Sequence, residues 1–228
     1  MIERPSPNFD TRERPVNAIV LHYTGMRTAD AALERLCDPD ARVSAHYLVH
    51  EDGAVVRLVR EGDRAWHAGV SHWRGVEGLN DTSVGIEIVN PGHEWGYRAF
   101  PDEQIRALIP LIAAIRERHD VPRANVVGHS DIAPARKDDP GELFPWEWLA
   151  RHRLCLPRPQ QPVADPLWSD AAFLIALQRW GYDVTDGPAA VRAFQRRWRP
   201  DEVTGVADGE CRAILLQLLM EREAGESR

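Results

Sequence analysis

The sequence contains almost no lysine. Of its 28 basic residues, Lys137 is the only lysine and all the others are arginine. Arginine presents a planar fork that suits carboxylate or phosphate, whereas lysine places a compact charge at one point, which suits a single oxygen atom. A developing oxyanion is such an atom. By itself, the lysine could equally stand on a solvated loop by chance, without a function. Whether it has a functional role therefore depends on the residues around it.

Cysteine and long apolar runs are also scarce. Three widely separated cysteines, Cys37, Cys155 and Cys211, indicate neither a disulfide framework nor a Cys-x-x-Cys metal site, so a metal would have to use histidine and carboxylate. No apolar run reaches the roughly 18 residues of a membrane span. Residues 1–15 lack the apolar stretch of a secretory signal. We therefore expect a cytoplasmic protein, or a periplasmic or wall-associated one if another route exports it.

The charge balance argues against a nucleic-acid partner. The net charge is −7, and binding to phosphate backbones draws on clustered lysine and arginine. The one dense basic run, residues 192–199, is typical of a solvated helix face. Eight tryptophans exceed what a core of this size needs. We expect Trp66, Trp73 and Trp95 to line a groove, because their segments are rich in glycine, histidine and asparagine.

The apolar pattern predicts an α/β fold with a central mixed β-sheet flanked by helices. Short apolar runs bounded by turn residues predict strands at 17–21, 45–49, 54–59, 83–89 and 125–127. Asp52-Gly53 between two of these runs predicts a hairpin. Apolar residues at helical spacing predict helices over 28–36 and 101–119.

A proline-rich connector, residues 156–166, indicates a division of the chain. We expect one domain over residues 1–155 and a small separate module over 167–228. Helical patterns in that module cover 168–180, 189–198 and 209–222. A monomer is the expected oligomeric state.

Polar side chains stand at or near the ends of the predicted strands. His22 follows strand 17–21, His129 follows strand 125–127, and Glu87 lies within strand 83–89. Taken singly, each has an ordinary explanation, such as a hydrogen-bonded core histidine or a solvent-facing glutamate. Polar residues at the carboxyl ends of strands, however, converge on one crevice in α/β sheets. The topology therefore favours a shared site.

Two histidines and one carboxylate with an open fourth position are typical of a catalytic zinc site. Asp139 can supply the carboxylate if the segment after His129 loops back. Zinc lowers the pKa of a water molecule and polarises a carbonyl. Glu87 would then accept the proton and pass it to a leaving amine, and Lys137 would donate to the oxyanion. The pattern predicts amide hydrolysis.

Five motifs, in this order, resemble the type 2 zinc N-acetylmuramoyl-L-alanine amidases. The resemblance covers about residues 15–150 and rests on Leu21-His-Tyr-Thr24, Ser44-Ala-His-Tyr47, Trp66-His-Ala-Gly69, Asn80-Asp-Thr-Ser-Val-Gly-Ile-Glu87 and Gly128-His-Ser-Asp-Ile-Ala-Pro-Ala-Arg-Lys-Asp-Asp-Pro140. It implies cleavage between the lactyl group of N-acetylmuramic or anhydro-N-acetylmuramic acid and the L-alanine of the stem peptide. The implied partners are peptidoglycan fragments or murein.

The resemblance also implies roles for individual residues. It places one zinc ion on His22, His129 and Asp139, and it gives the catalytic acid and the oxyanion donor to Glu87 and Lys137. Beside the substrate groove, as contacts or as structural supports, it places His46, Trp66 and His67. The remaining histidines match nothing catalytic, and we expect surface positions or local hydrogen bonds for His50, His72, His93, His119 and His152.

Two alternatives stay open. The last three predicted helices resemble a peptidoglycan-binding domain, but a shortened turn between Tyr182 and Ala190 leaves a packing or dimerisation role open. The same fold also occurs in recognition proteins that bind peptidoglycan without cutting it. The presence of all five site residues favours the enzyme.

Overall fold

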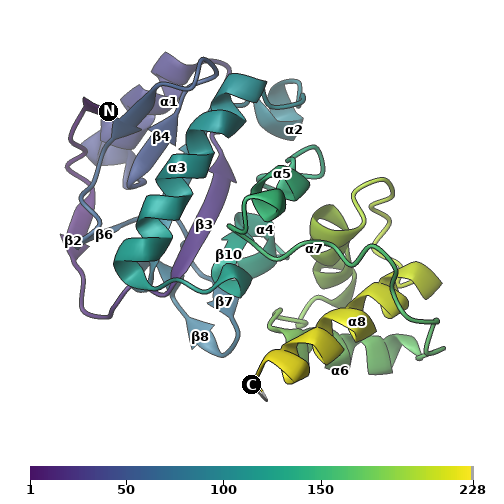
Figure 1. Ribbon diagram of the computed structural model, residues 1–228. Coiled ribbons are helices and arrows are strands. Elements are labelled where there is room, and N and C mark those ends of the chain that lie inside the picture. Colours follow the sequence, from purple (N-terminus) through teal and green to yellow (C-terminus); the bar gives the residue numbers. More distant parts are fainter. Residues whose placement is uncertain (227–228) are drawn as a thin grey trace.

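A mixed six-stranded sheet forms the centre of the N-terminal part of the computed structural model, which describes residues 1–226 (Figure 1). The strand order is β1-β5-β4-β9-β3-β10, and only β4 and β5 pair antiparallel. The predicted fold class is therefore confirmed. The strands are β1 (Ile2–Glu3), β3 (Ala18–Tyr23), β4 (Tyr47–Val49), β5 (Val55–Arg57), β9 (Ser83–Ile88) and β10 (Val126–Gly128).

The predicted hairpin joins β4 to β5. Gly53 has a φ of 85°, and its N–H donates to the His50 carbonyl at 3.0 Å. The side chain of Asp52 accepts from the Ala54 N–H at 2.9 Å. A tight turn needs this positive φ, which glycine adopts without a steric penalty.

Several small elements surround the sheet and were not predicted. Two short antiparallel pairs are β2 (Phe9–Thr11) with β6 (Asp63–Ala65), and β7 (His72–Trp73) with β8 (Val76–Glu77). Short helices are α2 (Gly92–Trp95), α4 (His129–Ile132) and α5 (Trp146–Arg151), with single 3-10 turns η1 (Pro39–Ala41), η2 (Leu79–Asp81) and η3 (Arg123–Asn125). Segments this short carry too little periodicity to stand out in a sequence.

One face of the sheet is covered by the long helix α3 (Asp102–His119), which crosses in front of it in Figure 1. The predicted alternation along β9 is confirmed, because Val84, Ile86 and Ile88 pack into one buried cluster with Ile105 and Leu108 of α3. Burial of these side chains is complete or nearly so. The residues between them on β9 therefore face the other side of the sheet.

That other face is covered in two separate places. Helix α1 (Ala29–Cys37) packs through Leu33 and Leu36 on Leu48 of β4. On the opposite side, Ala18 and Val20 of β3 belong to a different cluster, to which the C-terminal helices contribute. The middle of the face, between these two clusters, carries His22 and Glu87.

The C-terminal helices are α6 (Asp170–Trp180), α7 (Gly187–Trp198) and α8 (Gly209–Glu226). They share one buried cluster with β3 and β10, so they do not stand apart from the sheet. Trp73 is part of that contact: it is 4% exposed and meets the ring of Tyr182 edge-on at 5.2 Å. The expectation that Trp73 lines a groove is wrong. The division at residues 156–166 stays a prediction.

The interpretation of the basic run 192–199 as a solvated helix face is also wrong. Arg197 and Arg199 are 7% and 4% exposed, and the side chain of Arg196 is 12% exposed. Arg197 packs over the ring of Trp146 at 3.7 Å and donates to the Leu156 carbonyl. Arg196 and Arg197 therefore face the N-terminal part of the chain, whereas Arg199 pairs with Glu202 and Asp208 within the C-terminal part. Across residues 1–226, no helix combines the length and the apolar character needed to cross a membrane.

Candidate functional site

The sheet itself places the first two site residues. In the parallel pair of β3 and β9, His22 lies directly beside Glu87, so both side chains leave the same face. Gly85, two residues earlier on β9, leaves room for a third ring. A Cβ atom at position 85 would lie 2.4 Å from Cγ of His67. A side chain there would push His67 away from the strand.

A loop brings the next residues to the same place. Residues 128–139, which we call the α4 loop, begin at the end of β10 and include helix α4. The Gly128 N–H donates to Oδ2 of Asp131 at 2.8 Å, which fixes the first turn of the helix. The Ser130 N–H donates to the Asp139 carbonyl at 2.8 Å. The loop therefore returns on itself and sets Asp139 beside His129.

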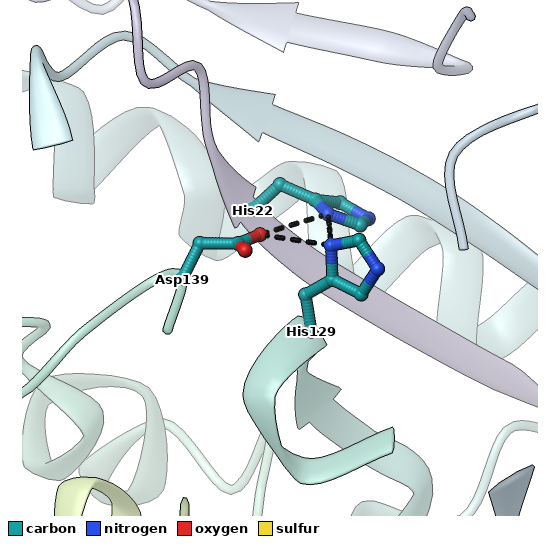
Figure 2. A group of neighbouring side chains, drawn as sticks. All are labelled: His22, His129 and Asp139. Carbon is teal, nitrogen blue, oxygen red and sulfur yellow. Dashed lines mark hydrogen bonds and ion pairs between the residues drawn. The ribbon is translucent and has the colours of Figure 1, made fainter. Parts of the chain in front are cut away.

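Three ligand atoms converge between the strand and the loop (Figure 2). Nδ1 of His22 lies 2.9 Å from Nδ1 of His129 and 3.0 Å from Oδ2 of Asp139. Nδ1 of His129 lies 3.1 Å from that same oxygen. All three residues are buried. The structure thus brings together the three residues that the sequence singled out as metal ligands.

A chain of hydrogen bonds sets the protonation of His22. The Ser83 hydroxyl donates to the Leu79 carbonyl at 2.5 Å, so Nε2 of His67, 3.3 Å from the same hydroxyl, has to donate to it. Nδ1 of His67 is then an acceptor, and Nε2–H of His22 donates to it at 3.0 Å. Nδ1 of His22 therefore carries a lone pair.

His129 has the same tautomer. Its Nε2 lies 3.1 Å from the Ala68 carbonyl, which can only accept, so Nδ1 is unprotonated in the neutral ring. Burial, together with the neighbouring His129, lowers the pKa of His22 to about 4. Burial alone would raise the pKa of Asp139, but the two histidines hold it well below its ordinary range.

This donor set fits a metal ion. Two imidazole lone pairs and a carboxylate oxygen face one another in a buried space, an arrangement that a cation between them would stabilise. The second nitrogen of each ring bonds to the protein, as is usual for metal-binding histidine. His22, His129 and Asp139 can therefore hold a metal ion from three sides.

Glu87 faces the same pocket. Burial, and then the negative charge of Asp139, raise the pKa of Glu87 well above its ordinary value, while the positive charge of Lys137 opposes them. Its Oε2 atom is buried and has no hydrogen-bond partner among residues 1–226. A carboxyl group with a raised pKa and a free oxygen in a pocket is suited to proton exchange.

Lys137 also lines this pocket, which has a volume of about 450 Å³. The lysine is partly exposed, and its backbone N–H donates to the Ala133 carbonyl at 3.0 Å. Helix α1 and the segment that follows β3 form other walls. Pocket residues to which sequence reasoning gave no role include Tyr23, Thr24, Met26, Arg35 and Glu94. Tyr23 and Thr24 could have been found from their place directly after His22, whereas Arg35 gives no signal in its helical pattern.

Of the three residues expected beside a substrate groove, two line the pocket and one does not. Trp66 and His67 line the pocket, and Trp66 donates its indole N–H to Asp10 at 2.6 Å. His46 does not line it. This ring is fully buried, accepts from the Gly85 N–H at 2.9 Å and lies 3.1 Å from the Asp63 carbonyl. His46 therefore supports β9 from within the protein, so of the two roles expected for it, the structure favours structural support over substrate contact.

Other histidines form local bonds, as expected. His93 and His119 pair with Glu142 and Glu61, and His72 accepts from the Gly75 N–H.

Comparison with known proteins places these residues in a family. Residues 12–142 match the family model described as N-acetylmuramoyl-L-alanine amidase. The N-acetylmuramoyl-L-alanine amidase AmiD of Escherichia coli is 37% identical, over 96% of this chain and 90% of that protein. The 1,6-anhydro-N-acetylmuramyl-L-alanine amidase AmpD of Haemophilus influenzae is 35% identical, over 62% of this chain and 86% of that protein.

A solved structure gives the same result. The complex of E. coli AmiD with the substrate anhydro-N-acetylmuramic acid-L-Ala-D-γ-Glu-L-Lys superposes with a TM-score of 0.83. That match covers 96% of this chain and 93% of the other, at 37% identity. The likeness therefore includes the C-terminal helices as well as the sheet.

Proposed function

Because the chain belongs to the N-acetylmuramoyl-L-alanine amidase family, we propose that it works as a zinc enzyme through the five residues gathered in its pocket. It hydrolyses the amide bond between N-acetylmuramic or anhydro-N-acetylmuramic acid and the L-alanine of the peptidoglycan stem peptide. One zinc ion is held by His22, His129 and Asp139. The observation that carries this proposal is the convergence of their three ligand atoms beside Glu87.

Zinc is the metal that suits these ligands. Two imidazoles and one carboxylate are a common catalytic set for zinc, and they leave a fourth position open. Bound there, zinc supplies Lewis-acid chemistry, in which it lowers the pKa of water and polarises a carbonyl. No cysteine lies among the ligands, which separates this set from the closed sites of structural zinc.

Glu87 moves the proton. Its carboxylate accepts a proton from the attacking water as the new C–O bond forms at the lactyl carbonyl carbon. It then gives this proton to the nitrogen of L-alanine as the C–N bond breaks. The products are a muramic acid with a free carboxylate and a peptide with a free amino terminus. The free Oε2 of Glu87 in the pocket supports this role.

Lys137 stabilises the charge that forms on the carbonyl oxygen. Its ammonium donates to this oxygen as it becomes an oxyanion, which is a compact target for a compact charge. His67 and Ser83 do not touch the reacting atoms. Through the hydrogen bond from Nε2 of His22, they keep Nδ1 of that ring directed at His129 and Asp139, the residues that would hold the metal with it.

The substrate form is a finer part of the proposal. The names of both curated relatives, and the ligand in the AmiD structure, concern muramyl or anhydromuramyl peptides. We propose that soluble anhydro-muropeptides are cleaved and that the protein acts as a monomer in the cytoplasm. Cell fractionation and light scattering test the last two points. Recovery with the cell envelope would favour polymeric murein as the substrate.

The test of the activity uses the full chain. Metal is removed by dialysis against a chelator and restored with zinc, and anhydro-N-acetylmuramyl-L-Ala-D-γ-Glu-L-Lys is added. Mass spectrometry should detect the free tripeptide with zinc present and none after chelation. If the zinc-loaded protein bound this muropeptide without cleaving it, the alternative of a non-catalytic peptidoglycan-binding protein would replace the enzyme.

A further inference from the structure

A buried hydrogen bond links the C-terminal helices to the beginning of the α4 loop. The hydroxyl of Tyr182, which follows α6, donates to Oδ1 of Asp131 at 2.6 Å. Both residues are buried. The other oxygen of Asp131 accepts from the Gly128 N–H, directly before His129. Tyr182 thus contacts the carboxylate that fixes the backbone on which His129 stands.

A second contact reaches the other end of the loop. Nη2 of Arg196, on α7, lies 2.7 Å from Oδ1 of Asp138. Asp138 stands between Lys137 and Asp139 in the sequence. The Arg196 side chain is only 12% exposed, and its Nε lies 3.8 Å from Oε2 of Glu142. The Asp138 side chain is 52% exposed, so this ion pair is partly screened by solvent, but it joins α7 to the stretch that carries both the oxyanion donor and the carboxylate ligand.

The two ends of the loop are also tied to each other. The Ser130 N–H donates to the Asp139 carbonyl, and Ile132 and Ala133 lie in the cluster that the C-terminal helices share. A displacement at either end is therefore transmitted to the other. By contrast, His22 and Glu87 sit on paired strands, and their neighbours His67 and His46 come from the N-terminal part of the chain.

We propose that Tyr182 and Arg196 are positioning residues for the amide hydrolysis, through which the C-terminal helices hold the α4 loop in its working geometry. This inference rests on the proposed function. It assigns the C-terminal helices a role in positioning the active-site loop, whether or not they also bind glycan. Buried polar partners of a metal site orient its ligands, and their loss lowers metal affinity or activity by about 10- to 100-fold.

The experiment compares five forms of the full chain: wild type, Tyr182→Phe, Arg196→Gln, Arg196→Lys and Arg179→Gln. Tyr182→Phe removes a hydroxyl and keeps the ring that packs on Trp73. Arg179→Gln is the matched control, because it removes an exposed ion pair to Glu223 within the same three helices. Zinc dissociation constants come from competition with a fluorescent chelator. The values of kcat and KM come from release of peptide from the muropeptide.

Tyr182→Phe should raise the zinc dissociation constant by about 10-fold, since it loosens the turn that bears His129. Arg196→Gln should lower kcat by about 10-fold with KM nearly unchanged, because it loosens Lys137 and Asp139. Arg196→Lys, which keeps the charge, should recover part of the lost kcat. The Arg179→Gln control should match wild type in all three quantities.

Wild-type zinc affinity and kcat in both Tyr182→Phe and Arg196→Gln would overturn the inference. So would a lowered melting temperature with both quantities unchanged, because the contacts would then only stabilise the fold. If wild type binds zinc but cleaves no muropeptide, the proposed function fails. The zinc affinities still decide whether Tyr182 positions the loop.

Discussion

The two halves of the site are built in different ways. His22 and Glu87 stand side by side on parallel strands, and the register of the sheet fixes their spacing. His129, Lys137 and Asp139 stand on the α4 loop, which contains a single short helix and is closed by a few hydrogen bonds. The first pair, His22 and Glu87, which we call the strand half, depends on local sequence pattern. The other three residues, which we call the loop half, depend on contacts from distant parts of the chain. We therefore expect a residue on the strands to be held more firmly than one on the loop.

Loss of a metal ligand should have the largest effect on zinc content and on cleavage. This effect should be the same for a ligand in either half of the site. His22→Ala and Asp139→Ala each leave two ligands where a catalytic zinc needs three. Both variants should contain far less than one zinc per chain, and cleavage should fall to background. Plasma mass spectrometry measures the metal. Stoichiometric zinc in either variant would remove that residue from the ligand set.

Glu87→Gln should be the next largest change and should separate chemistry from metal binding. The amide keeps the shape of the side chain but cannot accept a proton. We expect kcat to fall by about 10²- to 10⁴-fold, with zinc content and melting temperature unchanged. If Glu87→Gln lost its zinc instead, Glu87 would be a metal ligand. Metal binding and proton transfer would then not be separate roles of His22 and Glu87.

Lys137→Arg tests the loop half. The charge stays, but the guanidinium does not place it at the same point, so kcat should fall by about 10²-fold with zinc content unchanged. Arg151→Lys is the matched control, because it makes the reverse exchange at an exposed position. Wild-type turnover in Lys137→Arg would refute the role assigned to the lone lysine.

The smallest expected effect is on stability, and it comes from a substitution at Glu61, outside both halves of the site. Burial alone would raise the pKa of Glu61, but bonds from Arg118, Tyr47 and His119 lower it from 4.5 to about 2. The ionised Glu61 carboxylate therefore stabilises the folded protein fully above pH 4.5, and this stabilisation is lost as the pH falls toward about 2. Glu61→Gln should melt below wild type at pH 7, and the gap should close as the pH drops through that window.

Activity provides the control for this variant. Glu61 does not line the pocket, so turnover per folded molecule should match wild type. A gap in melting temperature that stays constant from pH 7 to pH 3 would show that the glutamate contributes nothing through its charge.

Much of the strand half could be predicted from the sequence. Alternation along residues 83–89 gave the face on which Glu87 lies, and the short apolar run 17–21 gave the strand that delivers His22. These patterns are local, and a period of two residues fixes a face. His46 shows the limit of such reasoning, because nothing in its motif separates a residue beneath the pocket from one inside it.

The loop half was harder to predict. Motifs named His129, Lys137 and Asp139, but the support of the α4 loop comes from Tyr182 and Arg196, far along the chain. Arg196 belongs to the run that we interpreted as a solvated helix face. Helical periodicity shows which side of a helix is polar, and it does not show whether that side meets water or an acidic loop.

The central claim is that both halves meet on one zinc ion, and X-ray absorption at the zinc edge tests it most directly. The reconstituted full chain should bind one zinc with two imidazole ligands at about 2.0–2.1 Å and oxygen in the remaining positions. His129→Ala should reduce the imidazole signal or lose the metal. A sulfur shell at about 2.3 Å, or a spectrum without imidazole, would contradict the account.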